Sequence, residues 1–163
     1  NNNIVFCPEY ARFENIYIPS VGMRTHWWCH KAMNFLYDKI SEAAFLEKPN
    51  ASYPEKILLS RRDISNRSLL NIKEFESFFS DRGYSIIRPE SLPIGDQIRM
   101  CTNASSIIGC TGSQMYLALF QKKDGKNIVF TPWNFSIKDD AMISDIRASK
   151  LMYSVLPWTQ LLV

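Results

Sequence analysis

Residues 107–120 read IIGCTGSQMYLALF, which is an apolar run, a Gly-Cys-Thr-Gly turn and a second apolar run of different period. A short apolar run bounded by turn residues is typical of a buried strand, and a spacing of three to four residues is typical of a helix. The stretch therefore predicts a strand at 105–108, a tight turn and a helix over about 113–121. Such a turn either only connects the two elements or uses its backbone N–H groups to bind a phosphate.

The same alternation of strand and helix continues on both sides of this stretch. Further strands are predicted at 56–60, 84–87 and 127–131, and further helices at 71–83 and about 97–102, with Gly83 ending the first of these helices. Residues 139–152 fit one more helix. Strands and helices that alternate at this spacing indicate an α/β fold. We expect a Rossmann-like three-layer α/β/α domain with a mainly parallel sheet.

The N-terminal third has a different pattern. Two short strands are predicted at 4–7 and 15–18, and apolar residues from Trp28 to Ala44 recur at helical spacing, which predicts one long amphipathic helix over about 25–46. We expect residues 1–54 to lead into the Rossmann-like domain at 55–163. The chain lacks a starting methionine, and we expect it to be a fragment of a longer protein.

The composition of the chain argues against several classes of function. A net charge of +3, with 19 basic residues scattered among 16 acids, argues against a nucleic-acid-binding surface, which needs clustered basic residues. The four cysteines form no Cys-x-x-Cys pair and the two histidines are far in sequence from all but Cys29, so we expect no zinc site. No Asp-x-Asp motif occurs, and we expect no metal dependence and no cofactor. No apolar stretch approaches the length of a membrane span. We expect a cytoplasmic protein, with peripheral membrane association as an alternative, or a protein of the secretory-pathway lumen if its source is eukaryotic.

Two loops are predicted at the edge of the sheet where ligands bind in such folds, outside the carboxyl ends of the strands. SRRDISNRSLLN at 60–71 contributes Arg61, Arg62 and Arg67, and GCTGS at 109–113 contributes backbone N–H groups at a helix N-terminus. Guanidinium groups bind phosphate in bidentate fashion, and a helix N-terminus attracts anions. Gly109 and Gly112 would let the backbone turn sharply and approach a ligand closely. Together these loops predict a site for a diphosphate.

Structural explanations exist for the same residues. The three arginines could be solvated loop charges or could pair with Asp63 and Glu74. Asn71 fits the N-cap of a helix, Gln97 fits a polar helix residue, and glycines are common in turns between strand and helix.

The order of these motifs resembles glycosyltransferase family 61, which includes bacterial capsular-polysaccharide enzymes, plant xylan arabinosyl- and xylosyltransferases and animal O-linked GlcNAc transferases. The similarity covers roughly residues 55–132. The matching residues are Ser60-Arg61, Arg67 with Asn71, Pro89-Glu90, Gln97, Gly109, Gly112 and Leu119-Phe120.

The resemblance implies the donor-binding half of a GT-B-like, metal-independent inverting enzyme of capsule or other polysaccharide biosynthesis, which transfers a sugar from a nucleotide diphosphate sugar to a glycan or polysaccharide acceptor. It implies donor-binding roles for Arg61, Arg67, Gly109, Thr111, Gly112 and Ser113, and supporting roles for Ser60, Asn71, Glu90 and Gln97.

The chain also departs from the family pattern. Thr111 stands where the family has His, and Ser113 stands where it has Ala. The imidazolium that would contact a phosphate is therefore absent, which keeps a non-catalytic, degenerate Rossmann-like module for protein or glycan binding as the alternative. Neither Asp63, His26 nor Glu90 is singled out as a catalytic base by the sequence.

Overall fold

The computed structural model describes residues 10, 12–18, 20–48, 51–62, 64, 69–132 and 138–156. Within these ranges the main sheet has the strand order β4-β3-β5-β6-β7, and every neighbouring pair is parallel. The strands are β3 (Lys56–Leu59), β4 (Ser85–Ile87), β5 (Ser106–Cys110), β6 (Lys126–Pro132) and β7 (Lys150–Leu156). The predicted α/β class with a parallel sheet is confirmed.

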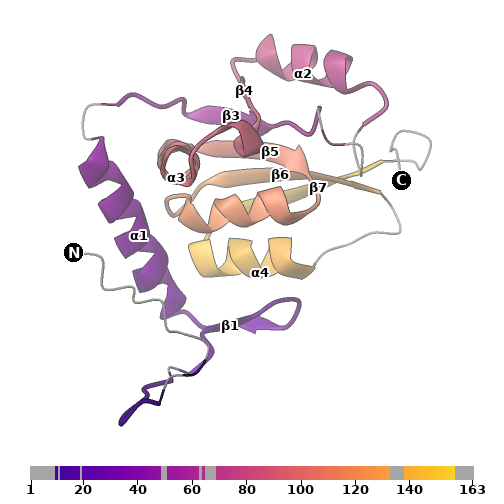
Figure 1. Ribbon diagram of the computed structural model, residues 1–163. Helices are drawn as coiled ribbons and strands as arrows, with labels where there is room; N and C mark the ends of the chain where they lie inside the picture. The colour runs from indigo at the N-terminus through magenta and orange to yellow at the C-terminus, as the bar shows by residue number, and fades with distance from the viewer. Residues whose placement is uncertain are drawn as a thin grey trace.

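Helices lie on both sides of this sheet, as in the three layers of a Rossmann-like fold, although the second face carries only α2 near β4 (Figure 1). One face carries α3 (Ile94–Asn103), the 3-10 helix η2 (Ser113–Phe120) and α4 (Lys138–Arg147), and α1 (Met33–Glu47) packs on α3 and η2. The other face carries α2 (Ile72–Ser80), which lies beside β4. A short 3-10 helix, η1 (Pro89–Ser91), precedes α3.

Strand register explains which residues each layer buries. Leu59, Gly109 and Val129 are aligned across the sheet and belong to the face that packs on Met115 and its neighbours in η2. Successive side chains of a strand point to opposite faces, so Cys110 and Phe130 belong to the other face. There the ring of Phe75 in α2 packs edge-on against Phe130, with the ring centroids 4.8 Å apart.

The strand order reverses between β3 and β5. From β3 the chain crosses α2 to β4 on one side, and then crosses α3 back to β5 on the other side. Both strands are almost fully buried, as expected for parallel strands covered on two faces. The loops after β3 and β5 therefore diverge at the carboxyl edge, which is where folds of this kind bind ligands.

The prediction for the N-terminal third was partly wrong. The helix begins at Met33, and residues before it form a hairpin of β1 (Met23–Arg24) and β2 (Trp28–Cys29). The backbone N–H of His30 donates to Gly22 across 2.8 Å and closes this hairpin, while Trp28 is 44% exposed, so it was not part of a buried helical stripe. Residues 15–18 form no strand, and the strand predicted at 4–7 lies outside the described residues.

Three boundaries also differ in the Rossmann-like domain. The strand β5 extends to Cys110 and so includes Gly109. The helix after it is a 3-10 helix, whose Met115 and Ala118 pack into the core. Helix α3 begins at Ile94 rather than near 97. The segment predicted as a helix over 139–152 ends at Arg147, and β7 follows it as an unpredicted edge strand. Among the described residues no helix is long and apolar enough to span a membrane.

Candidate functional site

A cavity of about 360 Å³ lies where the strand order reverses. Its walls come from α1, η1, α3, η2 and the residues that follow β3. Four residues predicted from the sequence line this one cavity, namely Arg61, Glu90, Gln97 and Ser113. Tertiary structure thus brings together side chains that the sequence distributes over more than 50 positions.

Arg61 provides positive charge at this cavity. It follows β3 directly and is only 5% exposed. Burial raises the pKa of the Cys110 thiol to about 11, and the nearby Arg61 charge acts in the opposite direction. Arg61 therefore lies next to the end of β5 and places a positive charge at the carboxyl ends of β3 and β5. Arg67, the other arginine expected to bind the donor, lies outside the described residues.

Arg62 points to a different partner. Its guanidinium forms a short ion pair with the buried Glu76 of α2, whose other carboxylate oxygen accepts from the Ser60 hydroxyl. The Ser60 hydroxyl in turn accepts from the backbone N–H of Arg62 across 3.1 Å. Ser60 thus fixes the start of the loop. The alternative in which Arg62 pairs with Glu74 is wrong.

The turn after β5 needs glycine at one position. Gly112 has φ 142° and ψ −176°, a region that only glycine adopts readily. The backbone N–H of Met115 makes the first bond of η2, to Gly112 at 3.0 Å, so the N–H groups of Ser113 and Gln114 precede the hydrogen-bonded part of the helix. Ser113 is exposed at the cavity wall.

Gly109 has another role than expected. It lies inside β5, and a Cβ atom there would come within 2.7 Å of the Met115 sulfur. The residue allows η2 to pack closely on the sheet, so the prediction that its backbone turns toward a ligand was wrong.

Thr111 is buried, with 2% of its surface exposed. Its backbone N–H is used by the sheet. Its hydroxyl makes no hydrogen bond to any described residue, but its nearness to Asp140 of α4 lowers the pKa of that carboxyl. Burial and the neighbouring Asp139 outweigh that effect and raise the Asp140 pKa to about 6. Thr111 therefore connects β5 to the acidic first turn of α4.

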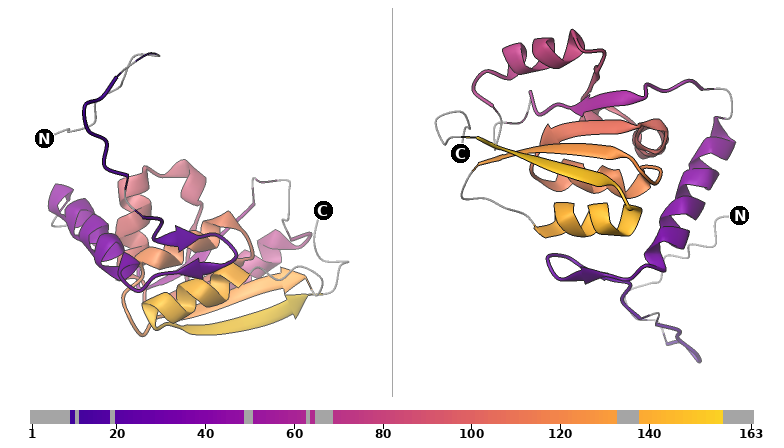
Figure 2. Two further views of the ribbon diagram at one scale, coloured as in Figure 1. Left: turned by 90° about the horizontal axis from the view of Figure 1, so that it is seen from below. Right: turned by 180° about the vertical axis from the view of Figure 1, so that it is seen from behind.

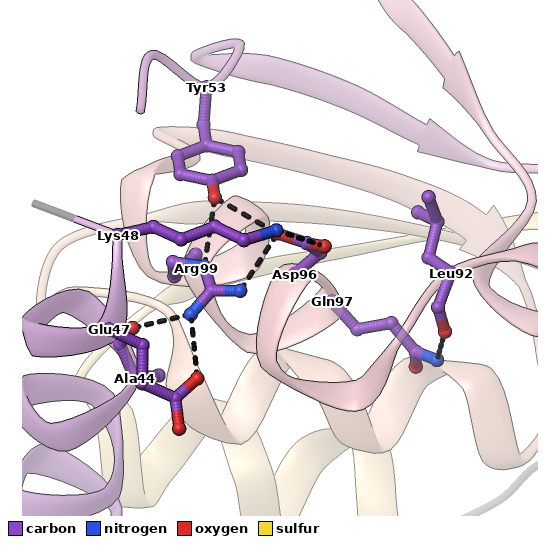
Figure 3. A network of polar contacts seen from close by, with 8 residues as sticks. All are labelled: Ala44, Glu47, Lys48, Tyr53, Leu92, Asp96, Gln97 and Arg99. Atoms are coloured by element: carbon purple, nitrogen blue, oxygen red, sulfur yellow. Dashed lines mark hydrogen bonds and ion pairs between the residues drawn. The ribbon is translucent and has the colours of Figure 1, made fainter. Parts of the chain in front are cut away.

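The supporting residues have structural contacts of their own. Gln97 donates to the Leu92 carbonyl at 2.8 Å and so fixes η1 against α3 (Figure 3). Glu90 lies in η1 and is exposed at the cavity. Asn71 does occupy the N-cap position of α2, although its side chain makes no capping hydrogen bond.

Arg99 anchors α3, the helix that carries Gln97. The buried guanidinium donates to Asp96 at 2.8 Å, to the Tyr53 hydroxyl at 2.8 Å and to the Ala44 carbonyl (Figure 3). Hydrogen bonds from Arg99 first, and then from Lys48, lower the pKa of Asp96 to about 2. This network ties α1 to α3 and sets the position of one cavity wall.

A second cluster, at the N-terminus of α4, was not predicted from the sequence. Asp139 is 1% exposed, accepts from the His26 backbone N–H at 2.5 Å and lies 2.7 Å from His26 Nδ1. The hydroxyl of Tyr116 also donates to Asp139, and Tyr116 lines the cavity. His26 and Asp139 are 113 positions apart, so no local motif marks the pair. Among the described residues no group of three or more His, Cys, Asp or Glu side chains is arranged to hold a metal ion.

The sequence of the chain was compared with models of known protein families. The model of the family described as Glycosyltransferase 61 matches residues 2–129, from the N-terminal segment to β6. The chain belongs to glycosyltransferase family 61. The match reaches further toward the N-terminus than the resemblance over 55–132, so the hairpin and α1 lie within the family region. No curated protein matches the chain. As a member of this family, the chain is a glycosyltransferase, which acts on a sugar donor and a glycan acceptor.

Proposed function

We propose that the cavity at the carboxyl ends of β3 and β5 binds the diphosphate of a nucleotide sugar, and that the enzyme transfers the sugar to a glycan with inversion, without a metal ion. In this proposal the domain is the donor-binding half of a GT-B-type enzyme. The observation that carries it is the position of Arg61 and of the η2 N-terminus at a single cavity where the strand order reverses.

The two groups at this cavity suit a diphosphate for different reasons. Arg61 supplies a charged fork with five N–H donors, which can bind two phosphate oxygens at once. The N–H groups of Ser113 and Gln114 precede the first bond of η2 and add donors together with a partial positive charge. A diphosphate that leaves the sugar gains negative charge, so the same donors stabilise the transition state.

Thermal unfolding with a uridine diphosphate sugar tests donor binding. A ligand that binds only the folded protein stabilises it by about 2.7 kcal/mol when its concentration is 100 times the dissociation constant. We expect uridine diphosphate and its sugars at millimolar concentration to raise the melting temperature, and Arg61→Lys to lose most of that rise, because a lysine cannot bind two oxygens in the same way.

Arg62→Lys is the matched control, since Arg62 is the next residue but pairs with Glu76 and lines another cavity. It should keep the ligand-induced rise. No rise in well-folded wild-type protein, or an equal loss in both variants, would contradict the proposal. Release of uridine diphosphate that continues in a chelator would support metal-independent transfer. Binding with no release would favour the non-catalytic module.

A further inference from the structure

Inverting transfer needs a base for the acceptor hydroxyl, and the cluster at the N-terminus of α4 has the geometry of one. His26 occupies the turn of the β1–β2 hairpin, which lies next to α4 in the views of Figures 1 and 2. The carboxylate of Asp139 holds two atoms of His26, the backbone N–H at 2.5 Å and Nδ1 at 2.7 Å. Because Nδ1 faces a carboxylate, it must carry the proton in the neutral ring, and Nε2 then has a free lone pair.

The backbone conformation at His26 follows from its place in the turn of the hairpin. His26 has φ 65°, in the left-handed region that residues other than glycine rarely adopt. This conformation places the backbone N–H of His26 toward the Asp139 carboxylate. The hairpin is already attached to α4 through the His26 N–H, so the additional bond at Nδ1 orients the ring. The side chain is 62% exposed, which leaves its outer edge accessible.

Two tyrosines connect this cluster to the donor cavity. Tyr116 lines the cavity, and its hydroxyl donates to the same Asp139 oxygen that pairs with His26. Tyr37 lines the cavity as well, and its hydroxyl donates to the Met23 sulfur of the hairpin at 3.6 Å. The hairpin and the N-terminus of α4 therefore adjoin the cavity wall.

We propose that His26 is the general base of the transfer and that Asp139 is the residue that positions it. This inference rests on the function proposed above. His26 Nε2 takes the proton of the acceptor hydroxyl while the acceptor oxygen forms its bond to the anomeric carbon. The bond from that carbon to the diphosphate breaks, and the diphosphate leaves with the electron pair. The imidazolium that forms is stabilised by the Asp139 carboxylate and later returns its proton to water.

The ring proton can be located without any substrate. The chain has two histidines, His26 and His30. Nitrogen-15 spectra of the side chains should show His26 with its proton on Nδ1. His30 is an internal reference for the other tautomer. Its Nδ1 accepts from the Ala32 N–H at 3.2 Å, so the proton of its neutral ring must be on Nε2. Asp139→Asn should move the His26 proton to Nε2, since an amide N–H would then face Nδ1. A His26 proton on Nε2 in the wild type would overturn the proposal.

Release of uridine diphosphate from its sugars, with water as acceptor, tests the catalytic role. We expect His26→Ala to slow release by about 10²–10⁴-fold and Asp139→Asn to slow it by at least tenfold, with the ligand-induced rise in melting temperature retained in both. His30→Ala should release at the wild-type rate. If the wild type releases uridine diphosphate and His26→Ala does so equally fast, the base is wrong and the proposed function stands. If the wild type neither binds nor releases, the proposed function fails, and the base assignment fails with it.

Discussion

The backbone N–H of Thr111 donates to the carbonyl oxygen of Phe130 across 2.8 Å, so the residue after β5 is tied to β6. This bond uses a donor that a phosphate-binding turn would otherwise offer to its ligand. The side chain is buried near Asp140, and its hydroxyl slightly lowers the pKa of that carboxyl. Replacement of the family histidine by Thr111 therefore leaves the donor diphosphate to Arg61 and the first residues of η2 in our proposal.

Asp140 should make stability depend on pH. Its folded-state pKa is about 6, raised from 3.8 by burial and by Asp139, so its contribution is fully favourable below pH 3.8 and is lost as the pH rises through 6. We expect Asp140→Asn to remove this loss. The free energy of unfolding of the wild type should fall between pH 4 and pH 7 by roughly 1–3 kcal/mol more than that of the variant. Urea unfolding at both pH values measures the difference. Asp145→Asn, an exposed change on the same helix, should leave the pH dependence intact.

Thr111→Val should raise the pKa of Asp140 further. The variant keeps the shape of the side chain and removes the hydroxyl that lowers the Asp140 pKa. We expect the loss of stability to occur at a higher pH than in the wild type, because the pKa of Asp140 is then raised further. Urea unfolding in steps from pH 4 to pH 8 locates the midpoint. A midpoint at or below that of the wild type would show that the Thr111 hydroxyl has no effect on Asp140.

Arg99 should control unfolding in acid. The pKa of Asp96 is lowered from 3.8 to about 2, so its contribution to stability is complete above pH 3.8 and is lost as the pH falls through 2. Arg99→Met removes the largest cause of this shift, and we expect acid unfolding to begin closer to pH 4. Lys48→Met removes the second cause and should have a smaller effect. Circular dichroism during acid titration compares the two variants, and the reverse order would contradict the assignment.

Gly112→Ala should destabilise the turn that begins η2. A residue with a Cβ atom at φ 142° and ψ −176° costs about 1–3 kcal/mol, which urea unfolding can measure. Gly83→Ala is the comparison, because Gly83 has φ 80° with no atom near the added Cβ and should lose about 1 kcal/mol. We also expect Gly112→Ala to weaken donor binding, whereas Gly83→Ala, at the end of α2, should not affect it.

Tyr116→Phe tests the link between the cavity and Asp139. Asp139 keeps both of its contacts to His26 in this variant. We therefore expect the rate of uridine diphosphate release to fall by about tenfold or less, a smaller loss than that of His26→Ala. The ratio of kcat to KM for the donor in both variants makes the comparison. A loss in Tyr116→Phe as large as that in His26→Ala would assign the proton transfer to the tyrosine instead.

Local sequence patterns predicted the elements of the domain well. Buried runs such as KILL at β3 and the turn at Gly83 have strong signals within a few residues, and both are present in the structure. The hairpin around His26 was predicted as helix because aromatic residues at helical spacing suggested a buried stripe, whereas Trp27 and Trp28 are exposed. β7 was missed because residues 150–152 were assigned to the preceding helix, whereas parallel pairing with β6 places them in a strand.

Local sequence patterns were enough to predict the α/β class, the alternation of strands and helices and the two loops with Arg61 and Gly112, because hydrophobic period and turn chemistry act over short distances along the chain. Tertiary structure alone decided that Arg61, Gln97 and Ser113 share one cavity, that Arg62 belongs to Glu76, and that His26 meets Asp139. These contacts join elements that are far apart in the sequence, and they form only when burial of the core fixes the strand order and the packing of helices on it.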